Sequence, residues 1–166
     1  MSQKIPLGSK ARCVISGVSG TVVSLIERLN GNIQHGVQPK SENGITMPEA
    51  WEIDVQSLEV TDPGISGWAT EPVPCPIKLG QRVRDWITGY EGVAASKHTY
   101  FNGCVHFIVV PLMKKGKTLL NEAPQGSYLS VERLRVIEES SSVLPADHEP
   151  TEKPTGGPSR RMVRNV

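Results

Sequence analysis

The chain has 166 residues, of which 37% are hydrophobic and 5% aromatic, with 16 glycines and 13 prolines. This length suits one ordinary domain or two small ones, and the composition is typical of a turn-rich β protein. The formal net charge is +1 and no run of about 18 apolar residues occurs, so we expect no membrane partner.

The first sixty residues predict short strands separated by glycine-rich turns. Asn30-Gly31 between two strand-like runs is a strong hairpin signal, because both central residues of the tight turn need positive φ. In the first strand Ala11, Cys13 and Ile15 alternate toward an expected core. We therefore predict strands over Lys10–Ser16, Thr21–Leu29, Asn32–Gln38 and Ala50–Ile53.

The end of this unit has its own pattern. Asp54–Val60 suits a single 3₁₀ turn that leads into a short closing strand, with Leu58 and Val60 facing inward. Trp51 is expected to pack on the body of the unit.

The same pattern returns 72 positions later without a gap. Leu7-Gly8 matches Leu79-Gly80, and Asn30-Gly31 matches Asn102-Gly103. After Pro39 the offset becomes 76, which places a four-residue insertion in the loop after the third strand. Because the matches fall on glycines and strand apolar residues, we infer an internal repeat, with units over 1–61 and 77–137.

Two segments lie outside the repeat. Residues 62–76 form a linker that Pro72, Pro74 and Pro76 should keep stiff, and Trp68 within it either staples the two units together or meets a partner. Residues 138–166 form a tail that we expect to be extended or disordered alone. Its basic and apolar end is either a solubilising terminus or a docking peptide that orders on a partner by adding a strand. The arginines of this end are Arg160, Arg161 and Arg164.

Charge is unevenly divided between the two units. Residues 5–61 carry four basic and six acidic side chains, a net −2, whereas residues 77–137 carry nine and four, a net +5. The difference favours two distinct contact partners or a head-to-tail contact between molecules. The longer loop of the second unit contributes Lys114, Lys115 and Lys117.

These lysines allow two interpretations. With Arg82, Arg84, Arg133 and Arg135, and with Tyr100 and Phe101 for stacking, they could bind nucleic acid. The other interpretation is a solvated loop or a salt-bridged protein contact.

No residue pattern points to catalysis, a cofactor or a metal. Cys13, Cys75 and Cys104 are odd in number and widely spaced, so we expect free thiols, with an intermolecular disulfide in an assembled particle left open. His98, Cys104 and His106 lie near one hairpin but lack further ligands for a metal. Asp85 has no second carboxylate nearby, and we expect it to cap turn amides or to pair with Arg84 or Arg82. The sequence therefore predicts a protein that is not an enzyme.

Five short strands, a hairpin and a 3₁₀ turn before the last strand predict an all-β protein, with two small SH3-like barrels in tandem. The stretch Leu79–Pro111 also resembles short uncharacterised proteins found in tailed-bacteriophage genomes. The shared pattern is Leu79-Gly80, Asp85, the Thr88–Gly92 turn and Phe101–Cys104. The first unit departs from it, with Cys13 in place of the aspartate.

This resemblance implies a virion structural protein, either a capsid decoration or cement protein or a head–tail accessory protein. Its partners would be capsid, portal or tail subunits, met in many copies by protein–protein contacts, in a virion assembled in the host cytoplasm. Trp68, the three loop lysines and the three tail arginines are the expected partner-binding residues. The alternatives are a nucleic-acid-binding accessory or regulatory protein, and an early protein that inhibits a host enzyme.

Overall fold

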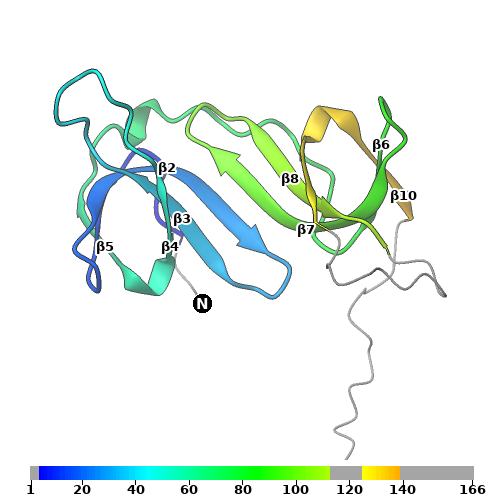
Figure 1. Ribbon diagram of the computed structural model, residues 1–166, viewed down its shortest axis with the longest axis horizontal. Helices are drawn as coiled ribbons and strands as arrows, with labels where there is room; N and C mark the ends of the chain where they lie inside the picture. Colours follow the sequence, from blue (N-terminus) through cyan, green and yellow to red (C-terminus); the bar gives the residue numbers. More distant parts are fainter. Residues whose placement is uncertain (1–3, 113–124, 139–166) are drawn as a thin grey trace, which may run out of the picture.

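The computed structural model describes residues 4–112 and 125–138, and this part of the chain is all-β (Figure 1). It contains antiparallel strands and three single 3₁₀ turns, and none of its helical turns is long enough to cross a membrane. The strands are β1 (Lys10–Cys13), β2 (Ser19–Arg28), β3 (Ile33–Gln38), β4 (Trp51–Asp54), β5 (Leu58–Asp62), β6 (Arg82–Asp85), β7 (Glu91–Tyr100), β8 (Val105–Val110), β9 (Ser127–Ser130) and β10 (Leu134–Glu138). The 3₁₀ turns are η1 (Val55–Ser57), η2 (Ser66–Trp68) and η3 (Val131–Arg133).

In the first half, β1 to β5, the hydrogen-bonded order is β5-β1-β2-β3-β4. The predicted Asn30-Gly31 turn joins β2 to β3, and Gly31 has a φ of 84°. The amide of Gly31 donates to the carbonyl of Arg28 at 2.9 Å, which closes the turn. Strand side chains, with Ile5 from before β1 and Val55 from η1, then bury a small core: Ile5, Ala11, Val22, Val37 and Val55.

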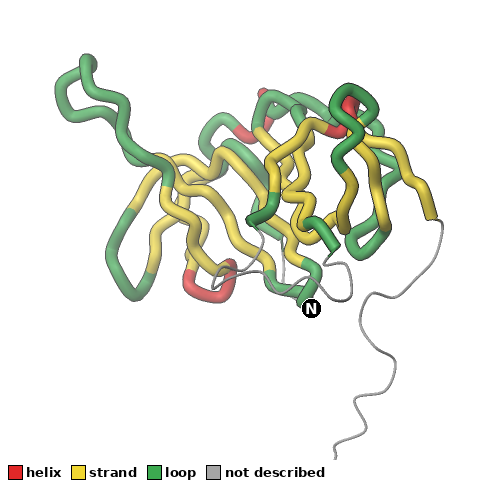
Figure 2. The backbone as a smooth tube through the Cα atoms, turned by 45° about the vertical axis from the view of Figure 1, so that its right-hand side comes forward, coloured by secondary structure: helices red, strands yellow, loops and turns green. Residues whose placement is uncertain are grey.

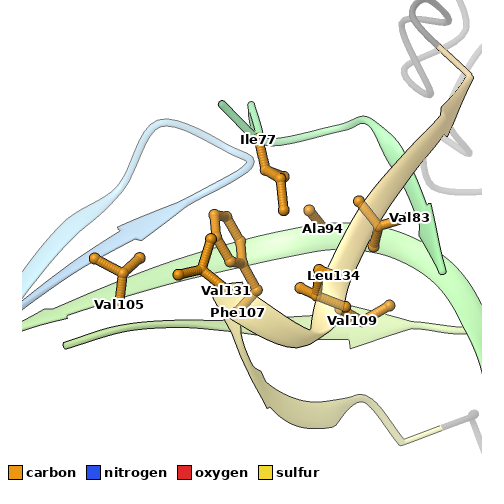
Figure 3. Close-up of a cluster of buried hydrophobic side chains, with 8 residues drawn as sticks. All are labelled: Ile77, Val83, Ala94, Val105, Phe107, Val109, Val131 and Leu134. Carbon is orange, nitrogen blue, oxygen red and sulfur yellow. The ribbon is translucent and has the colours of Figure 1, made fainter. Parts of the chain in front are cut away.

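In the second half, β6 to β10, the order is β10-β6-β7-β8-β9. Its core is larger, and Phe107 is its largest fully buried side chain (Figure 3). The buried cluster consists of Ile77, Val83, Ala94, Val105, Phe107, Val109, Val131 and Leu134.

The backbone details of the two halves agree at the predicted offset. The register of β2 shifts between Val22 and Ser24, and that of β7 shifts between Ala94 and Ser96. A Cβ added at Gly20 would lie 2.2 Å from the carbonyl oxygen of Gln38, and one at Gly92 would lie 2.3 Å from that of Val110. Only glycine fits this close approach of two strands, which explains the glycine at both positions.

The two halves join edge to edge, because β2 pairs antiparallel with β7. Ser24 lies opposite Tyr100 and Arg28 opposite Ser96, with Ile26 opposite His98 between them. Positions 24 and 96 correspond at the 72-residue offset, as do positions 28 and 100. Exchanging the two strands therefore gives the same set of pairs, so β2 and β7 are related by a local two-fold axis. The result is one ten-stranded antiparallel sheet that is not closed. In Figures 1 and 2 the halves lie side by side, with β5 and β10 at the two ends.

Three predictions about side-chain direction are wrong. The first strand ends at Cys13, so Ile15 lies in the following turn and is 82% exposed instead of facing the core. Trp51 lies at the start of β4 and is exposed instead of packing on the body of its unit. Val60 is likewise exposed, whereas Leu58 packs against the core.

The linker starts on the first half, where the amide of Ile65 donates to the carbonyl of Gly8 at 3.0 Å, and then runs along the second half. The amide of Thr70 donates to the carbonyl of Phe101, and that of Val73 donates to the carbonyl of Gly103, both at 3.0 Å. The predicted stiff linker therefore follows the β7–β8 hairpin. The prediction for the tail lies outside the described residues, except that β10 extends to Glu138.

Candidate protein-contact surfaces

The predicted partner-binding residues divide into one that the structure describes and six that it does not. Trp68 ends η2 with its side chain 79% exposed, so it does not staple the two halves together, and the alternative of a partner contact stays a prediction. The other six lie outside the described residues: Lys114, Lys115, Lys117, Arg160, Arg161 and Arg164.

The most prominent surface feature is the β3–β4 loop, residues 39–50, which we call the arm. It projects from the first half at the upper left of Figure 1 and again in Figure 2. Its fold is fixed by its own polar side chains. The Oδ1 of Asn43 accepts from the amides of Ile45 and Thr46 at 2.9 and 2.8 Å, and the Oγ of Ser41 donates to the carbonyl of Thr46 at 2.8 Å. The arm is therefore an ordered loop despite its exposure.

The tip of the arm is apolar. Ile45 is 91% exposed and Met47 is 77% exposed, more than any other large apolar side chains of the described chain except Ile15 and Trp68. Sequence reasoning missed both residues. The available signal was two apolar residues within a polar Asn-Gly and proline loop, which has no opposite strand against which to bury them.

A second feature is the β6–β7 turn, which is organised by Asp85. This carboxylate is fully buried and accepts from the amides of Ile87 and Thr88, each at 3.3 Å. The guanidinium of Arg133 donates to both of its oxygens, at 3.1 and 2.6 Å. The predicted capping of turn amides is confirmed, but the predicted ion pair with Arg84 or Arg82 is wrong, because η3 brings Arg133 beneath the turn instead.

These contacts also set the ionisation of Asp85. Hydrogen bonds from Arg133 and then Thr88 hold the pKa of its carboxyl well below the ordinary range. The carboxylate therefore stays ionised and hydrogen-bonded within the turn. A carboxylate with so low a pKa is poorly suited to act as a general base.

The turn presents Trp86 and Ile87 to solvent, both more than half exposed. The indole Nε1 of Trp86 donates to the carbonyl of Glu132 at 3.3 Å, which fixes the ring. At the equivalent turn of the first half, Val14 and Ile15 are exposed in the same way. Both halves thus present two consecutive apolar residues at the same place in the fold.

An open groove of about 540 Å³ runs between the linker and β10. Val73, Pro74 and Pro76 line one side, and Leu134 and Val136 line the other. Polar side chains enter at its margins: Gln81, Glu132 and Arg135.

The arginines that the nucleic-acid interpretation requires are engaged within the protein. Arg84 and Arg82 both pair with Glu91, and Arg133 pairs with Asp85. Arg135 donates to the backbone carbonyls of Glu132 and Leu134. A cation already neutralised by a carboxylate, or bound to backbone oxygens, has less to offer a phosphate chain.

The aromatic residues proposed for stacking are also in use. The hydroxyl of Tyr100 is hydrogen-bonded to that of Tyr128, and its ring meets His106 edge to face with centroids 5.8 Å apart. Phe101 comes so close to Gly8 that a Cβ there would lie 2.8 Å from its ring. These contacts leave less of the two rings free for stacking on a base.

The histidine and cysteine side chains form no metal site among the described residues. His98 and His106 pack instead around Tyr128, with the His106 ring stacked on it at 4.7 Å. Burial lowers the pKa of His98, which favours its neutral form. Cys13, Cys75 and Cys104 are all free thiols.

Comparison with known proteins adds no further information on function. No protein-family model, curated protein or solved structure matches this chain.

Proposed function

We propose that this chain is a non-enzymatic structural protein of a tailed-bacteriophage virion, a capsid decoration or head–tail accessory protein built from two SH3-like barrels in tandem. The observation that carries the proposal is the exposure of large apolar side chains on loops held rigid by hydrogen bonds: Ile45 and Met47 on the arm, and Trp86 and Ile87 on the β6–β7 turn.

Such surfaces are suited to contact with other proteins. An apolar side chain on a flexible loop loses conformational freedom when it binds, whereas one on a fixed loop has already lost it. Exposed Trp and Ile side chains clustered at fixed positions are typical of protein interfaces. In this chain they lie on projecting turns instead of lining a deep cavity, so the expected ligand is a surface of another protein.

The barrel assignment is supported by the strand order in each half. The order β5-β1-β2-β3-β4, with η1 directly before β5, is the order expected of an SH3-like unit, and β6 to β10 repeat it with η3. The buried strand faces of each half enclose separate cores, which supports two units.

The phage assignment rests on the sequence pattern around Asp85, and the geometry gives that pattern a structural meaning. The hydroxyl of Thr88 donates a hydrogen bond to the carboxylate of Asp85 within the turn. The amide of Gly89, which has a φ of 76°, donates to the backbone carbonyl of Asp85 at 2.8 Å. The part of the shared pattern from Asp85 to Gly92 builds this turn, as expected when a lineage keeps a fold and varies its contacts.

Mass spectrometry of purified particles tests the proposal. Particles banded in a density gradient should contain this chain in many copies, in constant ratio to the major capsid protein. Its presence in the infected lysate but absence from the banded particles would overturn the virion assignment. Salt-dependent binding to DNA in a mobility assay would instead support the nucleic-acid alternative.

A further inference from the structure

The arm presents an apolar tip that no part of its own described chain covers. Ile45 and Met47 lie between two acidic residues, Glu42 and Glu49, and the loop that carries them is internally bonded. Burying these two side chains would remove apolar surface from water without the entropic cost of ordering a flexible loop. An exposed apolar tip of this kind is suited to contact with another surface.

The groove between the linker and β10 is a hollow of matching chemistry. Its walls are apolar, from Val73, Pro74 and Pro76 on the linker side to Val136 on β10, and its volume of about 540 Å³ exceeds that of two aliphatic side chains. Because β10 bonds only to β6 among the described strands, the groove follows an edge of the sheet.

The arm of a molecule lies far from its own groove. The arm projects from the first half, and β10 lies at the opposite end of the second half (Figures 1 and 2). The two halves are joined by the β2–β7 pairing, which keeps these features apart. Any contact between them must therefore involve two molecules.

Charge favours the same contact. The half that carries the arm has a net charge of −2 over residues 5–61. The half that carries the groove has six basic and three acidic residues within 77–112 and 125–137, a net +3. Opposite net charges steer the arm of one molecule toward the groove half of another and disfavour contact between like halves.

We propose that the arm of one molecule inserts Ile45 and Met47 into the linker–β10 groove of a second copy of this chain. The contact joins two different surfaces, so each molecule offers one arm and one groove, and association continues head to tail into rings or open chains. The interface is small, so we expect a dissociation constant between about 1 μM and 1 mM. This inference goes beyond the proposed function, because it needs only the purified chain and no particle.

Sedimentation velocity of the full chain over a range of concentrations tests the contact. The weight-average sedimentation coefficient should rise with concentration, and high salt should reduce the rise because the charged halves are screened. A coefficient that stays at the monomer value up to about 1 mM would overturn the proposal.

Two variants identify the surfaces. The arm variant is Ile45→Ser with Met47→Ser, and the groove variant is Val73→Glu with Pro74→Glu. Each should weaken self-association by at least about tenfold, since each removes the apolar contact from one side. Ile15→Ser is the matched control, because Ile15 is as exposed as the arm residues but lies on a different turn. Thermal unfolding verifies that each variant is folded, and Pro76→Glu serves as a second groove variant.

Mixing the two variants gives the decisive result. The groove variant keeps an intact arm and the arm variant keeps an intact groove, so an equimolar mixture should form dimers that do not grow further. Failure of the mixture to associate, or undiminished self-association of either folded variant alone, would show that other surfaces are used and would overturn the proposal. Particle composition, which tests the proposed function, is unaffected by any of these outcomes.

Discussion

The β1–β2 turn of the first half and the β6–β7 turn of the second half have equivalent backbone hydrogen bonds. They differ in the side-chain contacts that stabilise them. The amide of Val14 donates to the carbonyl of Ser57 at 2.9 Å, and the amide of Trp86 donates to that of Arg133 at 3.0 Å. Ser57, however, stands where the second half has Arg133, so the first turn cannot form the ion pair that joins Arg133 to Asp85. In the first half the Sγ of Cys13, at the position of Asp85, accepts from the amide of Ser16 at 3.4 Å, so both turns are capped by a side chain and the ion pair is an addition of the second half.

The two cores differ at one equivalent position, which is polar in the first half and apolar in the second. His35 occupies the place in β3 that Phe107 occupies in β8, and both are fully buried. His35 is satisfied by hydrogen bonds, because its Nε2 accepts from the amide of Ile5 and its Nδ1 donates to the carbonyl of Ser24, both at 3.2 Å. The first half thus ties its N-terminal segment through a polar core residue, whereas the second half relies on apolar packing.

The largest expected effect on stability comes from truncating Phe107, the apolar residue at this equivalent position. Phe107→Ala should lower the free energy of unfolding by about 3–5 kcal/mol, because it removes a fully buried ring and leaves a cavity. Urea denaturation followed by circular dichroism measures the loss. Ile15→Ala, at an exposed position, is the control and should change stability by less than about 0.5 kcal/mol. A loss below about 1 kcal/mol for Phe107→Ala would contradict the packing described for this core.

The next effect tests the ion pair. Arg133→Ser gives the second half the residue found at Ser57, and it should lower the midpoint of thermal unfolding by roughly 5–10 °C, because buried Asp85 loses its cationic partner. Arg135→Ser is the matched control with a smaller expected shift.

Adding Asp85→Cys, which copies Cys13, should recover part of the loss because the unpaired carboxylate is then removed. If the losses of stability of Arg133→Ser and Asp85→Cys simply add in the double variant, Arg133 and Asp85 are not energetically coupled.

A pH dependence distinguishes the two cores. Burial lowers the pKa of His35 from its usual value of 6.5, so the unfolded chain takes up a proton at a higher pH than the folded chain. The contribution of His35 is therefore complete above about pH 6.5 and is lost as the pH falls below that value. His35→Phe should flatten the stability profile below pH 6.5, with His98 accounting for a remaining slope. An unchanged slope in this variant would contradict a neutral, buried His35.

The smallest expected effect concerns the linker. Trp68→Ala should change the free energy of unfolding by less than about 0.5 kcal/mol, because the side chain is 79% exposed. A loss above about 2 kcal/mol in chemical denaturation would revive the interpretation of Trp68 as a staple between the halves.

Much of the backbone could be predicted because local residues determine it. Gly31 and Gly103 have φ of 84° and 85° at the predicted hairpin turns, and both 3₁₀ turns precede their closing strands as expected. Side-chain direction failed where a strand ended early, as at Ile15, since alternation indicates inward and outward positions only while the strand continues.

Long-range partners could not be predicted for a different reason. Asp85 lies near Arg82 and Arg84 in sequence, but adjacent residues of a strand point to opposite faces, and only the folded chain brings Arg133 within reach. The pairing of β2 with β7 likewise has no local signal, because an apolar strand with a free edge can pair with many others. The apolar tip of the arm was missed because Ile45 and Met47 have no periodic neighbours.

The most direct test of the account is the register that joins the halves. Leu29 bonds to Ala95 across β2 and β7, so hydrogen-bonded pairs alternate from there and place Ile26 and His98 in a close, non-hydrogen-bonded pair. In the NMR spectrum of the full chain we predict a strong nuclear Overhauser effect between the Hα atoms of Ile26 and His98. A strong Hα–Hα effect from Ile26 to a residue other than His98, or no such effect between β2 and β7, would contradict the two-fold join.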